Sequence, residues 1–477
     1  MRKRIASILL VALMLLSLLP VPAWAAEVTE EVSVGDINGT DGIDITDVNC
    51  LYEYLITGEQ DGSLSEKQFQ AAADLNKDGQ INIYDLQILY EVASGLLSID
   101  DLPGNDKNKV KIGFLCMSDE YTVPGYCFIN DAKAAIANLG LTEDDYILKT
   151  FVPEDSNCYE FAVELVSAGC NIIFGNSFGY ETYMMDAAKE FPDVQFCNFS
   201  GTRAHTEGLS NYHNAFASIY DGRYLTGIAA GMKLNEMINA GKFTAAEAKI
   251  GFVACFDYSE VVSAYTAFFL GARSVCPSVT MDVAYTGCWY DVQLEKTAAK
   301  TLIARGCKLI SQTSSSIGAP IACENAGVPN VACDSCNLDL APNTYIISSR
   351  INWTPYMEYA IRCVQNGDAI DTDWTGTLST GSVVLTELNT AVADDGTAEA
   401  INAAAAKLKS GELHVFDCST FTVNGKTVTS YKVDVDYDPE YTPDTQVIVD
   451  GYFAESTFRS APYFNLHIDG ITLLIDS

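Results

Sequence analysis

Oxygen-bearing side chains recur with the same spacing in two segments, Asp36–Asp47 and Asp74–Asp85. A twelve-residue loop with oxygen donors at positions 1, 3, 5, 9 and 12 encloses a hard cation such as calcium. The expected ligands are Asp36, Asn38, Thr40, Asp44 and Asp47 in the first loop, and Asp74, Asn76, Asp78, Gln80 (through its backbone carbonyl), Asn82 and Asp85 in the second. The spacing therefore predicts two bound Ca²⁺ ions.

Each loop leads into one amphipathic stretch, over residues 48–56 and 86–97, and ends on Asp rather than on the Glu of ordinary EF-hands. This pattern, within residues 33–101, resembles dockerin domains, which are small all-α modules with two EF-hand-like calcium loops. The resemblance implies docking onto a cohesin of a scaffold or cell-surface protein. In that family loop positions 10 and 11 face the partner, and here they are Ile45, Thr46, Ile83 and Tyr84.

Charge and the N-terminal segment restrict the setting in which the protein works. The 477 residues carry a formal net charge of −35, which disfavours nucleic acids and anionic membrane surfaces as partners. A basic start, an apolar run over residues 8–19 and the small residues Ala23, Ala25 and Ala26 predict a signal peptide over residues 1–26. We therefore expect a secreted or surface-attached bacterial protein without direct membrane insertion, with a polar linker at 102–109.

The remainder of the chain, residues 110–477, alternates strand-like and helix-like segments, which predicts α/β lobes with parallel sheets and helices on both faces. Residues 249–255 repeat the pattern of residues 110–116, so two similar lobes are expected. We place the first lobe at about 110–247 plus segments after 350, and the second at about 248–349. A β-rich segment at 415–477 is expected to close over one lobe.

Aromatic and polar side chains gather in the loops that follow the expected strands. Ligands of such folds bind beyond the carboxyl ends of the strands, so these loops are expected to line a groove between the lobes. Aromatic faces hold flat rings, while carboxylates and amides pair with hydroxyls and ring nitrogens, which suits a purine base or nucleoside. The candidate ligand-binding residues are Tyr126, Asn130, Phe178, Phe256, Tyr258, Trp289, Asp334, Asn352 and Trp353.

The segments 173–180, 188–194, 220–227 and 269–275 resemble the basic-membrane-protein (BMP) family of substrate-binding proteins for ABC importers. The resemblance implies the two-lobed type I periplasmic-binding-protein fold, purine nucleoside or base binding, and an ABC permease as a further partner. It places Phe178, Trp289 and Asp334 on ligand-contacting loops and Asn352-Trp353 on a strand of the cleft, with Asp334 as the polar anchor. Asn130, Ser315, Ile351 and Cys336 depart from the family pattern.

An enzyme is the alternative interpretation. Gly175-Asn-Ser177-Phe-Gly179 matches the nucleophile elbow of serine hydrolases, which also lies between a strand and a helix. A secreted, dockerin-bearing esterase would need a later acid and then a His beside Ser177. The chain holds four His residues, at positions 205, 213, 414 and 467, and none stands in a loop with an obvious partner. We therefore expect a receptor rather than an enzyme.

Overall fold

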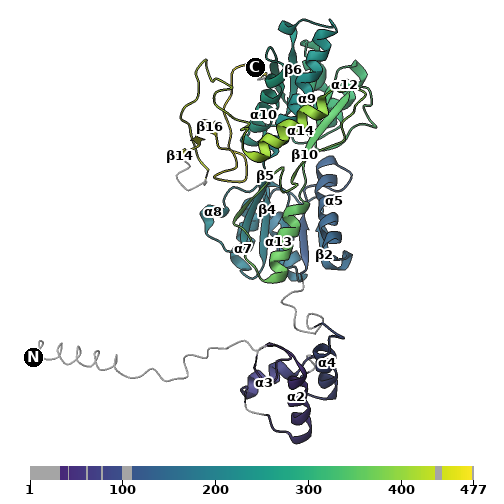
Figure 1. Ribbon diagram of the computed structural model, residues 1–477, viewed down its shortest axis with the longest axis vertical. Coiled ribbons are helices and arrows are strands. Elements are labelled where there is room, and N and C mark those ends of the chain that lie inside the picture. The colour runs from purple at the N-terminus through teal and green to yellow at the C-terminus, as the bar shows by residue number, and fades with distance from the viewer. Residues whose placement is uncertain are drawn as a thin grey trace, which may run out of the picture. The chain divides into compact units, whose positions relative to one another are not determined.

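The computed structural model describes residues 33–40, 42–60, 63–76, 79–98, 110–435 and 443–474. The chain divides into two compact units, residues 1–109 and 110–477 (Figure 1). The expected signal peptide at 1–26 and the linker at 102–109 lie outside the described residues.

The described part of the N-terminal unit is helical, with α2 (Ile45–Thr57), α3 (Glu66–Ala73) and α4 (Ile83–Ala93). Asp44 caps α2 together with Asp47, and Asn82 caps α4 together with Asp85, so the last residues of the two loops also fix the starts of the helices. Leu51, Phe69 and Leu89 lie in its buried core. Helix α3 was not predicted from the sequence.

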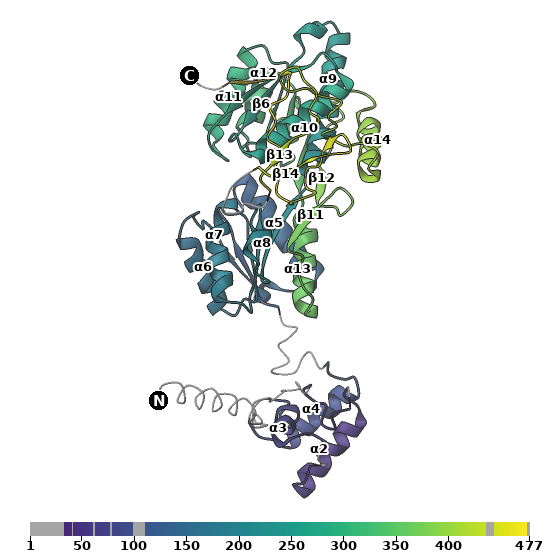
Figure 2. The same ribbon diagram turned by 90° about the vertical axis from the view of Figure 1, so that its left-hand side faces the viewer.

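The first lobe is built on a parallel sheet with the strand order β11-β5-β4-β3-β1-β2. The strands are β1 (Ile112–Leu115), β2 (Tyr146–Lys149), β3 (Ile172–Gly175), β4 (Gln195–Phe199), β5 (Tyr212–Ala217) and β11 (Asp373–Gly376). The helices are α5 (Val123–Asn138), α6 (Asn157–Ser167), α7 (Glu181–Glu190), α8 (Ala204–Glu207) and α13 (Thr354–Asn366). Helices α5 and α13 cover one face of this sheet, and α6 and α7 cover the other (Figure 2). Alternate strand residues pack on these opposite faces: Phe114 and Phe174 toward α5 and α13, Ile173 and Phe196 toward α6 and α7.

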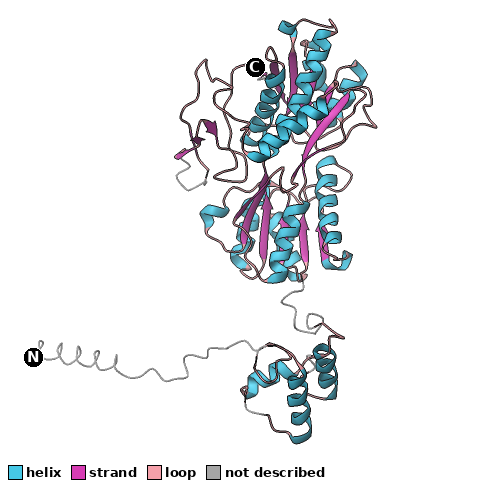
Figure 3. Ribbon diagram, viewed as in Figure 1, coloured by secondary structure: helices cyan, strands magenta, loops and turns pink. Residues whose placement is uncertain are grey.

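The second lobe likewise combines a sheet with surrounding helices (Figure 3). Its strand order is β12-β10-β9-β8-β6-β7-β17. The strands are β6 (Lys249–Ala254), β7 (Thr280–Tyr285), β8 (Leu309–Gln312), β9 (Asn330–Cys333), β10 (Tyr345–Ile351), β12 (Val383–Leu385) and β17 (Ile471–Leu474). The helices are α9 (Ile219–Asn239), α10 (Ser259–Val275), α11 (Val292–Ala304), α12 (Gly318–Ala326) and α14 (Thr397–Ser410). Strand β12 pairs antiparallel with β10, and the other pairings in this sheet are parallel.

The chain passes between the lobes after Ala217, after Ile351 and between β11 and β12. The first passage corrects the boundary expected near residue 247, because α9 packs on α10 of the second lobe. A Cβ built on Gly227 would lie 2.1 Å from the carbonyl oxygen of Phe268, and one on Gly271 would lie 2.0 Å from that of Tyr224. The two helices can approach this closely only because glycines stand at their contact.

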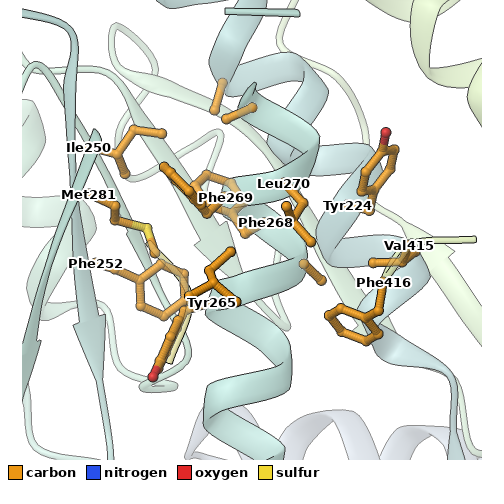
Figure 4. Close-up of a cluster of buried hydrophobic side chains, with 14 of the residues drawn as sticks. Tyr224, Ile250, Phe252, Tyr265, Phe268, Phe269, Leu270, Met281, Val415 and Phe416 are labelled. Atoms are coloured by element: carbon orange, nitrogen blue, oxygen red, sulfur yellow. The ribbon is translucent and has the colours of Figure 1, made fainter. Parts of the chain in front are cut away.

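The segments after residue 350 divide between the lobes. Helix α13 and β11 join the first lobe, whereas β12, α14 and residues 415–435 and 443–474 pack mainly with the second. The C-terminal segment holds short strands, β13 (Lys432–Val433), β14 (Thr445–Gln446), β15 (Ile448–Val449) and β16 (Tyr452–Phe453), and then β17 at the edge of the sheet. In Figure 4 α10 lies between Phe252 and Met281 of the sheet on one side and Tyr224 and Phe416 on the other.

Candidate ligand-binding site

Asp334 is the first residue after β9 and adopts an unusual backbone conformation, with φ of 61°. Its backbone N–H donates to the carbonyl of Ser349, 3.2 Å away, which fixes the residue against β10. The Oδ2 atom accepts a hydrogen bond of 3.0 Å from the hydroxyl of Ser315, and Oδ1 lies 3.9 Å from Nη2 of Arg223. The carboxylate is therefore held by groups from two other elements of the second lobe.

Behind Asp334 lies a set of charges that the sequence analysis did not identify. Arg223, on α9, is buried and donates from Nη2 to the Sγ atom of Cys333, 2.8 Å away. Burial, assisted by the charge of Asp334 and opposed by that of Arg223, raises the pKa of Glu260, at the start of α10, to about 7. The sequence feature that could have indicated a buried role for Arg223 is its position, as a charged residue, inside a largely apolar helical segment.

Three of the predicted aromatic residues gather in the second lobe, beyond the carboxyl ends of β6 and β7. The rings of Phe256 and Tyr258 are stacked, with centroids 5.0 Å apart and planes 16° from parallel. The ring of Trp289 meets that of Phe256 edge-on at 5.3 Å. Tyr258 is exposed, so one aromatic member of this cluster is open to a ligand.

The first lobe contributes Tyr126 and Asn130 from α5 and Phe178 from the short helix η4 (Phe178–Tyr180). The ring of Phe178 is 49% exposed, and Tyr126 is also exposed, whereas Asn130 is half-buried. The Sγ atom of Cys127, beside Tyr126 on α5, donates to the carbonyl of Asp334 at 3.6 Å. This contact joins the lobes and brings α5 to the loop that carries the carboxylate.

Asn352 and Trp353 lie where β10 leads into α13, and their contacts are largely internal. The ring of Trp353 packs against Phe199, with centroids 4.4 Å apart, and its backbone N–H donates to Asp131 at 2.9 Å. Asn352 donates from its amide nitrogen to the carbonyl of Gly381 at 3.0 Å. These contacts connect the segments that pass between the lobes, and a ligand contact for either residue stays a prediction.

Asp131 completes this junction. It accepts two hydrogen bonds, of 3.1 and 3.0 Å, from Nη1 of Arg350 on β10, in addition to the one from Trp353. Because Asp131 belongs to α5 and Arg350 to the second sheet, the ion pair links the lobes beside the candidate site. Sequence reasoning gave no sign of it, since the partners are 219 residues apart.

The hydroxyl of Ser177 donates to a carboxylate oxygen of Glu154. The His side chains contact other groups: His205 lies 3.2 Å from Asp373, His213 is 2.8 Å from Gln195, and His467 is 3.1 Å from Tyr265. The ring of His414 stacks on that of Tyr452. Within the described residues the elbow serine is therefore paired with an acid, and these contacts give no support to a Ser–His pair.

The two loops of the N-terminal unit have matching internal geometry. Asp47 accepts hydrogen bonds from the backbone of Ile37, Asn38 and Asp44, and Asp85 accepts the equivalent three from Leu75, Asn76 and Asn82. Of the other expected ligands, Asp36 accepts from the backbone of Thr40 and Asp74 from that of Gly79. Asp78 lies outside the described residues, and among those described no group of three or more His, Cys, Asp or Glu is placed to hold a metal ion.

The donor set of these loops still fits calcium, because every expected ligand supplies oxygen and the first-position carboxylates turn back into their loops. The four predicted partner-facing residues, Ile45, Thr46, Ile83 and Tyr84, are exposed. Tyr52 and Tyr90, one on each of α2 and α4, are exposed as well.

Two lobes with parallel sheets, joined by several passages of the chain, are the architecture of solute-binding proteins. Comparison with known proteins supports this class. The chain belongs to the Bmp family, ABC transporter substrate-binding protein PnrA-like, whose model matches residues 137–415. A model of the type I dockerin domain matches residues 34–91. Both resemblances drawn from the sequence are thereby confirmed. No helix in the part of the chain that the structure describes is long and apolar enough to cross a membrane.

Two relatives have described roles. A putative ABC transporter glucose-binding protein of Haloferax volcanii is 31% identical over 252 residues, which cover 53% of this chain and 60% of that protein. A purine-binding protein of Brucella abortus is 28% identical over 313 residues, or 65% of this chain and 84% of that protein. The chain thus spans less than two thirds of the Haloferax relative.

Solved structures share the fold at low sequence identity. An ABC transporter solute-binding protein of Conexibacter woesei superposes with a TM-score of 0.52 at 20% identity, covering 64% of this chain and 98% of that one. One of Aeropyrum pernix gives a TM-score of 0.54 at 17% identity, covering 67% and 94%. The predicted two-lobed α/β fold is therefore confirmed.

Proposed function

We propose that this protein is a secreted receptor that captures a purine nucleoside or base between its lobes, for ABC import or for sensing. The observation that carries the proposal is the joint placement of the Phe256–Tyr258–Trp289 cluster and the fixed carboxylate of Asp334 in the second lobe. The exposed ring of Phe178 and the N-terminal half of α5 complete the site from the first lobe. The purine-binding relative from Brucella supports this ligand class.

In this proposal the aromatic rings hold the flat base, and Asp334 accepts hydrogen bonds from ring nitrogens or ribose hydroxyls. Ser315 and Arg223 keep that carboxylate oriented before the ligand arrives. Closure of the lobes around the ligand then provides the signal that a permease or sensor recognises. A sugar is the second candidate, because the Haloferax relative is described as glucose-binding and a carboxylate beside aromatic rings also suits diols.

The test is a thermal-shift panel with the full chain and adenine, hypoxanthine, inosine, adenosine, guanosine, ribose and glucose. A nucleoside at about 100 times its Kd stabilises the protein by about 2.7 kcal/mol, so a purine binder is readily detected. We expect the shift to be clearly reduced in Asp334→Asn and to persist in full in Asp339→Asn, an exposed acid of the same loop. Shifts with glucose or ribose alone would redirect the assignment to sugars.

The receptor proposal excludes catalysis, and the esterase alternative has its own test. A screen of nitrophenyl esters with the wild type and Ser177→Ala decides it, because the hydroxyl is the only nucleophile that the elbow offers. We expect no turnover above background in either protein. Turnover that is lost on substitution would establish the esterase and overturn the receptor proposal.

We further propose that the dockerin unit binds two Ca²⁺ ions and tethers the receptor to a cohesin at the cell surface. The residues that would hold the ions are the loop ligands named above, and bound calcium would neutralise their clustered carboxylates. Chelation with EDTA is expected to remove the unfolding transition of this unit and to leave that of residues 110–477. Unchanged calorimetry after chelation would contradict calcium binding.

Tethering is tested by capture of the calcium-loaded chain on immobilised type I cohesins. We expect capture to be lost when Ile45→Asp and Ile83→Asp are combined, because both exposed residues stand at loop position 10. The control is Leu96→Asp, which alters an exposed apolar residue beyond the end of α4. Equal capture of the double variant and the control would place the partner elsewhere.

A further inference from the structure

A cavity of about 270 Å³ lies where the chain passes between the lobes, and it is called the hinge cavity here. Its lining includes Ser218 and Asp221 at the start of α9, Thr375 on β11, Ser379 in the passage to β12, and Lys409 near the end of α14. It shares no lining residue with the candidate site around Asp334. Because β11 belongs to the first lobe and α9 and α14 to the second, a molecule in this cavity touches both lobes.

The lining of the hinge cavity carries two acids, Asp221 and Glu455, and one base, Lys409. Burial raises the pKa of Glu455 to about 8, so this acid is largely protonated at neutral pH and Asp221 is the anionic group. Asp221 accepts a hydrogen bond of 2.8 Å from the hydroxyl of Ser218, and no Lys or Arg of the described chain forms an ion pair with it. Burial raises the pKa of Asp221 to about 6, so the group remains mostly ionised at neutral pH.

Lys409 supplies the positive charge and, within the same described residues, likewise has no ion-pair partner. Lys407, two residues earlier on α14, pairs instead with Glu412 at 3.2 Å. The hydroxyls of Thr375 and Ser379 belong to the same lining. An unpaired acid, an unpaired base and hydroxyl groups around a small volume match the charges of a zwitterion of a few heavy atoms.

We propose that the hinge cavity binds a small zwitterion, a free amino acid, with its ammonium group on Asp221 and its carboxylate on Lys409. The ligand bridges the lobes at their junction and acts as an effector distinct from the molecule captured beside Asp334. Its regulatory meaning rests on the proposed receptor function, whereas its binding does not. Occupancy restricts the relative movement of the lobes and so changes the affinity of the main site.

The test is thermal unfolding of the full chain with each common L-amino acid at about 10 mM, a concentration that reveals millimolar binding. At least one amino acid is expected to raise Tm by about 2 °C or more. Its N-acetyl and methyl-ester derivatives each lack one charge and are expected to give no shift. The shift is expected to disappear in Asp221→Asn and in Lys409→Gln, and to persist in the control Lys407→Gln.

Asp334→Asn separates this proposal from the receptor proposal. The amino-acid shift is expected to survive that substitution, and a shift lost in Asp334→Asn but kept in Lys409→Gln would assign the amino acid to the main site. The absence of any shift in the wild type, or its survival in Lys409→Gln, would also overturn the proposal. Lys409 is exposed at the end of a helix, so this variant decides the matter even where Asp221→Asn does not fold.

Discussion

Replacement of Asp334 by Gly and by Ala separates the role of its backbone from that of its side chain. With φ of 61°, the residue occupies the left-handed region, where a Cβ atom costs about 1 kcal/mol relative to glycine. We therefore expect Asp334→Gly to be more stable than Asp334→Ala by about 1 kcal/mol. For a folding unit of this size, the difference in Tm is about 1–2 °C.

Ligand binding is expected to respond differently, because both variants lack the carboxylate. A hydrogen bond to a charged group contributes about 1.5–3 kcal/mol, so each variant is expected to bind a purine nucleoside roughly 10- to 100-fold more weakly. Isothermal titration of the two variants and the wild type measures this loss. Asp334→Asn serves as the control, since Asn tolerates the left-handed backbone but carries no charge.

Two results would refute this reasoning. Equal or greater stability of Asp334→Ala relative to Asp334→Gly would show that the backbone is not constrained as described. Wild-type affinity in Asp334→Gly would show that the carboxylate is not the anchor, and that Ser315 and Arg223 hold it for a structural purpose alone.

Three further predictions concern charge and packing. The pKa of Glu260 in the folded protein is raised to about 7, so the wild type loses stability as the pH rises from about 4.5 to 7. The Tm of Glu260→Gln minus that of the wild type should therefore increase between pH 5 and 8, and a difference that stays constant would contradict this. Burial lowers the pKa of His213 to about 4, so the free energy of unfolding falls as the pH drops from 6.5 toward 4. In calorimetry at acid pH, the Tm of His213→Gln should depend less on pH than that of the wild type, and an equal pH dependence of the two proteins would count against this reasoning. Helix propensity favours Ala over Gly by about 1 kcal/mol, but Gly227→Ala is expected to destabilise by about 2 kcal/mol or more in urea titrations, because the new Cβ meets α10; stabilisation would disprove the close contact.

Several features followed from local sequence. The repeated Asp and Asn spacing predicted the paired loops, and the structure gives Asp47 and Asp85 the same hydrogen bonds. The alternation of apolar strands and helical segments predicted two parallel sheets with helices on both faces. These features can be predicted from sequence because loop geometry, helix capping and the alternation of side chains along a strand depend on residues close together in the chain.

Tertiary structure alone decided which distant residues meet. Arg223 reaches Cys333 across 110 positions, and Cys127 reaches the carbonyl of Asp334 across 207. The lobe that α9 joins depended on glycines that let this helix approach α10 closely, and the packing of the Trp353 ring on Phe199 was not evident from the sequence. The spacing of residues along the chain does not predict these contacts, because close packing and the pairing of buried charges form only when the lobes assemble.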